Sequence, residues 1–152
     1  AKMALHHELP NIKGTVLWYA KAAVDNVGNY GTALRQIHWR YPALQPEMPH
    51  IDHKVPKKPR KVKVLDMDGQ RVLFWQPPKG KKWHDVAMKY VVYRFQHGES
   101  VNISDVSKIV AITTDTFYEL PSIPSGTRVV YVVTALDRIQ NESKAVKVKV
   151  KG

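Results

Sequence analysis

The stretch Thr127-Arg-Val-Val-Tyr-Val-Val-Thr-Ala-Leu-Asp137 decides the fold of this chain. Valine, tyrosine and threonine dominate it, and such β-branched and aromatic residues favour strands. Ser125-Gly126 before the stretch and Asp137 at its end are residues that favour turns. A run so apolar does not belong in a surface loop, so it predicts a central strand of an all-β domain.

Further strand patterns begin near residue 60 and continue to the end of the chain. Lys144-Ala-Val-Lys-Val-Lys-Val150 alternates lysine with valine, which is typical of a strand with one buried and one exposed face. Residues 104–110 open with Ser104-Asp105, which are favourable helix caps, so we expect a short helix there. The other predicted strands are 61–65, 71–75, 89–95 and 113–120.

The length leaves room for a second, smaller part before this domain. The chain has 152 residues, whereas a sandwich of seven strands needs only about 100. Residues 14–20 are an apolar run without alternation, which predicts a strand buried on both faces. Residues 30–39 have helical spacing and residues 40–53 are rich in proline, so they predict a helix and an extended strap. We expect residues 54–59 to be a solvated linker to the β-domain.

The net charge of +11 lies almost wholly in the C-terminal part. Residues 54–152 hold 19 of the 24 Lys and Arg residues and 9 of the 13 Asp and Glu residues. A basic surface attracts polyanions, but these lysines lack the interleaved aromatic residues of a nucleic-acid stacking platform. We therefore expect solubilising lysines and no nucleic-acid partner. The chain has no apolar run of membrane-spanning length, so we also expect no membrane contact. Without cysteine it has no disulfide framework.

Several landmarks in residues 60–152 resemble those of a fibronectin type III domain. Leu73-Phe-Trp75-Gln-Pro77 resembles the strand whose tryptophan is buried between the sheets, and Tyr90-Val-Val-Tyr93 resembles the strand of alternating tyrosine and valine that follows. Leu120-Pro121 and Tyr131-Val-Val-Thr-Ala135 resemble the crossing between the sheets, and Asn141-Glu-Ser143 resembles the last turn.

This resemblance implies the fold class and the core. The expected fold is mainly β: an immunoglobulin-like, fibronectin type III-like β-sandwich of seven strands, preceded by the short α/β segment and the Pro-rich strap. The implied structural core consists of Trp75, Tyr90, Leu120 and Tyr131. The Tyr131 hydroxyl is expected to bond back to the connection around Leu120, the arrangement called a tyrosine corner.

The leading segment resembles part of a second family. Asn11-Ile-Lys-Gly-Thr-Val-Leu-Trp-Tyr-Ala20 and Arg40-Tyr-Pro-Ala-Leu-Gln-Pro-Glu-Met-Pro49 are similar to the end of the barrel in bacterial glycosyl-hydrolase-like lipoproteins. In that family a (β/α)8 barrel is followed by a fibronectin type III-like domain. The resemblance implies that residues 1–53 are the tail of a barrel domain and residues 60–152 the domain that follows it.

The function implied by the resemblance is that of a non-catalytic accessory or structural module from the C-terminus of a glycoside hydrolase involved in carbohydrate processing. Glycoside hydrolysis usually needs two carboxylates, and the family places such groups on earlier barrel strands. The chain itself is therefore not expected to be an enzyme. Its expected partner is its own barrel domain, and its expected location is outside the cytoplasm, in the cell envelope or secreted.

Four residues are candidates for carbohydrate binding. Trp18, Tyr19 and Lys21 lie near the end of the presumed last barrel strand and could line a sugar subsite, although packing in a barrel core is the alternative for the two aromatic residues. Trp83 lies in a basic loop, where it could stack on a sugar or pack against the sandwich. The second hypothesis is therefore an independent module that binds polysaccharide through Trp83 or a protein through a strand edge. Residues 1–53 are also a candidate surface for self-association.

The remaining motifs do not indicate a metal site or a catalytic site. His50-Ile-Asp-His53 and His6-His7 lack a further ligand nearby, so we expect no metal site. No nucleophile elbow, phosphate loop or dinucleotide motif occurs, so we expect no catalytic residue and no cofactor. Asn102-Ile-Ser104 and Asn141-Glu-Ser143 fit the glycosylation triplet, which matters only in a eukaryotic secretory protein.

Overall fold

The computed structural model describes residues 8–12, 14–80, 82 and 86–152 of the chain. The chain divides into two compact units, Ala1–Pro46 and Glu47–Gly152. Among the described residues, no helix is long and apolar enough to cross a membrane.

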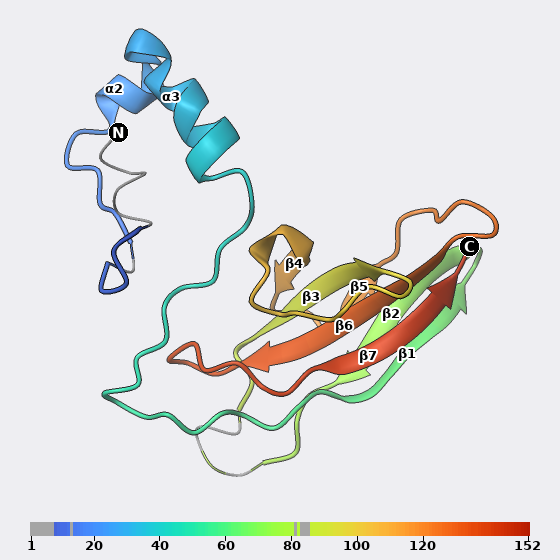
Figure 1. The fold of residues 1–152 in the computed structure, drawn as a ribbon. Coiled ribbons are helices and arrows are strands. Elements are labelled where there is room, and N and C mark those ends of the chain that lie inside the picture. The colour runs from blue at the N-terminus through green and yellow to red at the C-terminus, as the bar shows by residue number, and fades with distance from the viewer. Residues whose placement is uncertain (1–7, 13, 81, 83–85) are drawn as a thin grey trace. The chain divides into compact units, whose positions relative to one another are not determined.

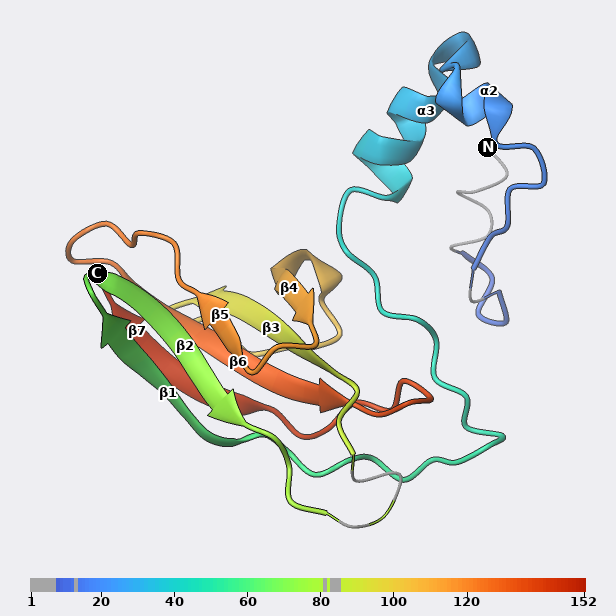
Figure 2. The same cartoon turned by 180° about the vertical axis from the view of Figure 1, so that it is seen from behind.

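The larger unit is a β-sandwich, drawn from opposite sides in Figures 1 and 2. One sheet has the strand order β1-β2-β5 and the other β4-β3-β6-β7, and all strand pairs are antiparallel. The strands are β1 Arg60–Met67, β2 Gln70–Gln76, β3 Lys89–Gln96, β4 Ile109–Thr113, β5 Phe117–Glu119, β6 Arg128–Leu136 and β7 Val146–Lys151. The predicted fibronectin type III-like fold is confirmed.

Strand β6 is central, as its sequence predicts. It pairs with β3 on one edge and with β7 on the other, and every residue after Arg128 is buried. Strand β7 lies at the sheet edge, where Lys147 and Lys149 are exposed and Val150 is buried. The charged face of β7 therefore remains in water while its valines pack on the core.

The core between the sheets contains the four predicted residues. Trp75, Tyr90, Leu120 and Tyr131 are 0%, 3%, 3% and 0% exposed. The rings of Trp75 and Tyr90 meet edge to face at 5.4 Å between centroids, a favourable arrangement for aromatic pairs.

The tyrosine corner is not formed as expected. The buried Tyr131 hydroxyl finds no hydrogen-bond partner among the described residues. The Leu120 carbonyl, which belongs to the connection that such a tyrosine binds, instead accepts a hydrogen bond of 3.1 Å from Gln70 Nε2. The side chain of Gln70 thus takes over part of the role predicted for Tyr131.

The region between β3 and β5 differs from the prediction. The expected helix in residues 104–110 is only one turn, the 3-10 helix η4 Val106–Lys108, which Asp105 caps by accepting from Ser107 N at 3.0 Å. Strand β4 follows at once, where the sequence suggested the end of a helix. The predicted strand 113–120 shortens to β5 because Asp115 N donates to Thr113 Oγ1 and turns the backbone.

The strap after residue 46 belongs to the sandwich unit, so the domain boundary lies earlier than the predicted linker at 54–59. Residues 42–59 form neither helix nor strand, as their prolines predict. Met48 N donates to Ile139 O, and Pro56 and Pro59 are buried. Residues 47–59, called the strap from here on, therefore contact the sandwich at several points, while Lys54, Val55, Lys57 and Lys58 are exposed.

The smaller unit is helical and lacks the predicted strand. Residues 14–20 have irregular backbone, and Val16 and Trp18 are 91% and 99% exposed. A strand buried on both faces needs neighbours on both edges, and the described residues of this unit supply none. The helical turns are α2 Lys21–Val24, η1 Val27–Asn29, α3 Tyr30–Ala33 and η2 Leu34–His38.

The last two of these turns form the helix predicted at 30–39. It runs from Tyr30 to His38 and widens to a π-helical turn at its end. Leu34 is 1% exposed, and Gly31 lies so close to the Ala23 carbonyl that a Cβ would be 2.2 Å from its oxygen. Only glycine permits this approach between α2 and α3.

Candidate functional site

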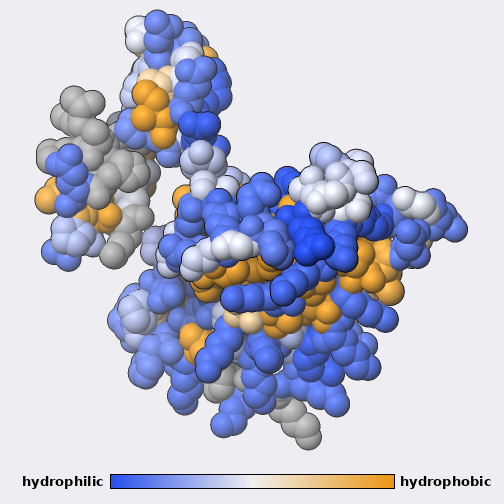
Figure 3. Space-filling view, turned by 45° about the vertical axis from the view of Figure 1, so that its right-hand side comes forward, coloured by the Kyte–Doolittle hydropathy of each residue, from blue (hydrophilic) through white to orange (hydrophobic). Residues whose placement is uncertain are grey.

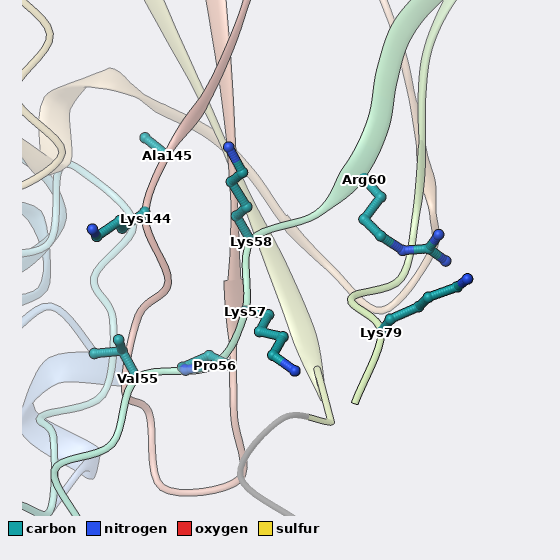
Figure 4. A pocket seen from close by; sticks show the side chains of 8 residues that line it. All are labelled: Val55, Pro56, Lys57, Lys58, Arg60, Lys79, Lys144 and Ala145. Carbon is teal, nitrogen blue, oxygen red and sulfur yellow. The ribbon is translucent and has the colours of Figure 1, made fainter. Parts of the chain in front are cut away.

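The sandwich unit has a basic groove, shown in Figure 4. Its volume is about 700 Å³. The strap, the segment after β2 and the segment before β7 contribute most of its walls, which consist of Val55, Pro56, Lys57, Lys58, Arg60, Lys79, Lys144 and Ala145. These eight residues define the basic groove. Five of them are cationic, and none is acidic.

The strap side of the basic groove is held by a buried side chain. Asn141, 2% exposed, donates from Nδ2 to the carbonyls of Asp52 at 3.3 Å and Lys54 at 3.2 Å. Pro56 and Pro59 have their own φ angles fixed by their rings and are themselves buried. The backbone that carries Lys57 and Lys58 is therefore constrained at both ends.

The other cations also extend from constrained backbone. Arg60 Nε donates to the Pro77 carbonyl at 2.9 Å, which ties the guanidinium to the segment that carries Lys79. Ser143, directly before Lys144, makes two hydrogen bonds of 2.9 Å with the backbone of Ala135. Figure 4 shows Arg60 and Lys79 pointing to one side of the groove and Lys144 lying at the other.

The buried carboxylate of Asp137 has a structural role. Its Oδ1 accepts from the backbone N–H groups of Ile139 and Asn141, both at 2.9 Å, and its Oδ2 accepts from Asn141 Nδ2 at 3.0 Å. Asp137 therefore orders the loop between β6 and β7, and through Asn141 it orders the strap. A carboxylate committed to three donors is not available as a general base.

Glu142 is committed in the same way. Its Oε1 accepts from the hydroxyl groups of Tyr93 at 2.7 Å and Thr134 at 2.6 Å. Burial, followed by the hydrogen bond to Glu142 and the charge of that carboxylate, raises the pKa of Tyr93 far above its usual range. The phenol is thus a fixed hydrogen-bond donor.

Three of the four predicted carbohydrate-binding residues lie in the described part of the smaller unit. Trp18 and Tyr19 are 99% and 68% exposed in the smaller unit, and neither lines the hollow of that unit. Lys21, the first residue of α2, forms an ion pair with Asp25 on the surface. Trp83 lies outside the described residues.

The smaller unit has a shallow apolar hollow of about 250 Å³. Its lining consists of Leu17, Ala20, Ala23, Val24, Gly31, Leu34, Arg35 and Trp39. Figure 3 shows hydrophobic residues at the surface of this helical region. Arg35 supplies the only charged side chain of this lining, so the hollow lacks the convergent polar groups of a binding site.

A second apolar hollow, of about 400 Å³, lies on the outer face of the three-stranded sheet. Leu65, Met67, Val72, Phe74 and Phe117 line it together with Gln70 and Glu119. Met67 and Phe117 are 58% and 47% exposed. This face offers contact area but no pair of catalytic groups.

The sequence did not indicate the basic groove or the Asp137–Asn141 pair. The lysines at 58, 79 and 144 are far apart in the chain, and only the excess of positive charge was visible. Asn141 looked like a turn residue or a glycosylation acceptor, whereas it is buried and donates three hydrogen bonds. The spacing of Asp137 and Asn141 around a turn was the available signal.

Comparison with known proteins finds no matching family model. Glycosyl hydrolase YngK of Bacillus subtilis (strain 168) is 29% identical over 147 residues, which are 96% of this chain and 28% of that protein. The chain thus spans less than a third of its relative's length, and the similarity includes both units.

Among solved structures, a mutant of FN3tt is 22% identical and matches with a TM-score of 0.47 over 64% of this chain and 97% of its own. The glycoside hydrolase domain of Endo-D from Streptococcus pneumoniae R6 is 20% identical, with a TM-score of 0.46 over 66% of this chain and 16% of its own. The chain is therefore similar over nearly all its length to a bacterial glycosyl hydrolase.

Proposed function

We propose that the chain is a non-catalytic accessory part of a glycosyl-hydrolase-like protein. On this proposal the sandwich is a structural module, and residues 1–46 are the end of a barrel domain. The observation that carries the proposal is the apolar surface of the smaller unit. Val16, Trp18, Val24 and Ile37 are 91%, 99%, 80% and 70% exposed. A soluble unit rarely exposes so many large apolar residues unless another surface covers them.

Two further observations support the proposal. The Bacillus relative contains the aligned 147 residues within a much longer chain, so a larger domain is available to cover such a surface there. The buried carboxylate of Asp137 and the carboxylate of Glu142 are used for hydrogen bonds that hold the sandwich together. Neither belongs to a pair of free carboxylates of the kind that glycoside hydrolysis usually requires.

The proposal includes a partner and a location. The partner is the barrel domain that residues 1–46 would complete, and the location is outside the cytoplasm, where polysaccharides are accessible. In the isolated chain, the same exposed apolar residues make the smaller unit a candidate for self-association.

A direct test measures hydrolysis by the chain alone. Incubation with a panel of neutral and acidic polysaccharides should release no reducing ends above buffer. Sustained release by the purified chain, abolished by Asp137→Asn or Glu142→Gln in a variant that remains folded, would overturn the non-catalytic assignment.

A second test uses the Bacillus relative. Removal of the part aligned with residues 47–152 should leave a protein that still hydrolyses its substrate, at a turnover number within a few-fold of the intact enzyme. If the truncated enzyme keeps its fold by circular dichroism but loses turnover, the sandwich is part of the catalytic machinery and not an accessory.

A further inference from the structure

We propose that the basic groove binds an anionic polysaccharide, a polymer with carboxylate, sulfate or phosphate groups along its sugar chain. The anionic character follows from the groove itself, whereas the choice of a sugar polymer rests on the proposed function.

Positive charge is concentrated along the groove. The five cations come from three segments of the chain, and the described lining contains no acidic side chain. Figure 4 shows Arg60 and Lys79 on one side of the groove and Lys144 on the other. A row of cations without acidic neighbours makes the local potential positive, which attracts a polyanion. One of the five, Lys57, already has an interaction, so the proposal depends on Lys58, Arg60, Lys79 and Lys144.

The backbone that carries the cations is fixed. The Asn141 contacts, the two buried prolines and the Ser143 bonds to Ala135 constrain the backbone beside the lysines, and the bond to Pro77 holds the Arg60 guanidinium. Solubilising lysines need no such constraint. Binding to cations on fixed backbone loses less conformational entropy than binding to cations on a mobile segment.

The size and lining of the groove indicate the kind of anion. A volume of about 700 Å³ lies in the range of ligand pockets and far exceeds the size of a single phosphate. The uncharged lining residues are Val55, Pro56 and Ala145, and the five others are cationic. The groove therefore favours a charged polymer that is recognised through its anionic groups.

The matched variants are two triple substitutions of equal charge. The groove variant is K58Q/K79Q/K144Q, and the control variant is K147Q/K149Q/K151Q on the outer face of β7. All six lysines are exposed, so both variants should keep the wild-type circular dichroism spectrum and melting temperature. Each variant lowers the net charge by the same amount, so only the position of the lost charges differs.

The measurement is the dissociation constant of the whole chain at low ionic strength. The probes are polygalacturonate, dextran sulfate, poly(glycerol phosphate), neutral dextran and single-stranded DNA. We expect binding to at least one anionic sugar polymer and none to neutral dextran. The groove variant should weaken binding by about tenfold, because three partly screened charge contacts are lost. The control variant should weaken it less than about twofold. The preferred probe among the first three identifies the anionic group.

Three results would overturn the proposal. One is absence of binding to all three anionic polymers, and another is equal weakening in both variants, which would indicate net charge alone. The third is tighter binding of single-stranded DNA with the same dependence on the groove lysines. The truncation test on the Bacillus relative is independent of all three results. The accessory role can therefore hold if the groove binds no polymer, and the groove can bind a polymer if the accessory role is wrong.

Discussion

Replacement of Asn141 by alanine should release the strap from the sandwich. The side-chain amide of Asn141 donates to the strap carbonyls of Asp52 and Lys54. It also donates to the buried carboxylate of Asp137. The substitution removes these contacts but keeps the backbone N–H that binds Asp137 Oδ1.

The expected loss of stability follows from those contacts. A hydrogen bond to a charged group contributes about 1.5 to 3 kcal/mol, and a neutral one about 0.5 to 1.5 kcal/mol. The two strap carbonyls share one donor group at 3.2 and 3.3 Å, so together they count as one neutral bond. Asn141→Ala should therefore lower the free energy of unfolding by about 3 kcal/mol, which is roughly 12 °C in the melting temperature of a domain of this size.

Urea unfolding followed by circular dichroism measures the global loss, and amide hydrogen exchange locates it. Exchange in residues 52–59 should accelerate more than exchange in β3 and β6. Asn102→Ala is the control, because Asn102 makes an exposed contact with the backbone of Ser104 and its loss should cost less than about 1 kcal/mol. A loss below about 1 kcal/mol for Asn141→Ala, with unchanged exchange in the strap, would refute the role of Asn141 in holding the strap.

Three other predictions concern the sandwich. Trp75→Ala should lower the free energy of unfolding by about 3 to 5 kcal/mol, because loss of a fully buried ring leaves a large cavity. Trp75→Phe should keep the domain folded. Calorimetry measures the loss of stability in both variants, and equal losses would contradict the packing account. Tyr93 should make the fold sensitive to alkali. An unfolded tyrosine ionises near pH 10, whereas burial raises the pKa of Tyr93 in the fold. The stability that Tyr93 contributes is therefore fully present below about pH 10 and is lost as the pH rises above it. The free energy of unfolding should therefore fall more steeply between about pH 10 and 11 than in Tyr93→Phe, and parallel curves for the two proteins would argue against it. Deletion of residues 1–46 should leave the melting temperature of the sandwich nearly unchanged, whereas deletion of residues 1–59 should lower it because the strap is lost. Equal melting temperatures for the two deletions would place the start of the sandwich domain at the predicted linker, residues 54–59.

Most of the sandwich could be predicted because its signals are local. The alternation in β7 and the apolar run of β6 record burial directly in the order of residues. Strand β4 was missed because its five residues follow a helix cap at Asp105. A short strand and the end of a helical turn are difficult to distinguish in such a segment.

The strap and the basic groove could not be predicted because both depend on contacts between distant residues. Asn141 and the Lys54 carbonyl are 87 positions apart, and nothing in the Pro-rich segment indicates where such a donor lies. The groove likewise joins Lys58, Lys79 and Lys144 only after the sandwich has formed. The strand expected at 14–20 failed for a related reason, since its β-prone residues need partner strands that the described chain does not provide.

Amide hydrogen exchange over the whole chain tests the central claim most directly: the sandwich is complete by itself, and the smaller unit needs an additional surface. The account predicts that amides in β3 and β6 exchange at least about a thousandfold more slowly than an unfolded peptide, since they open only with global unfolding. Residues 14–38 should be protected less than about tenfold. Protection of residues 14–38 as strong as that of β6, in a chain shown to be monomeric by sedimentation, would contradict the claim.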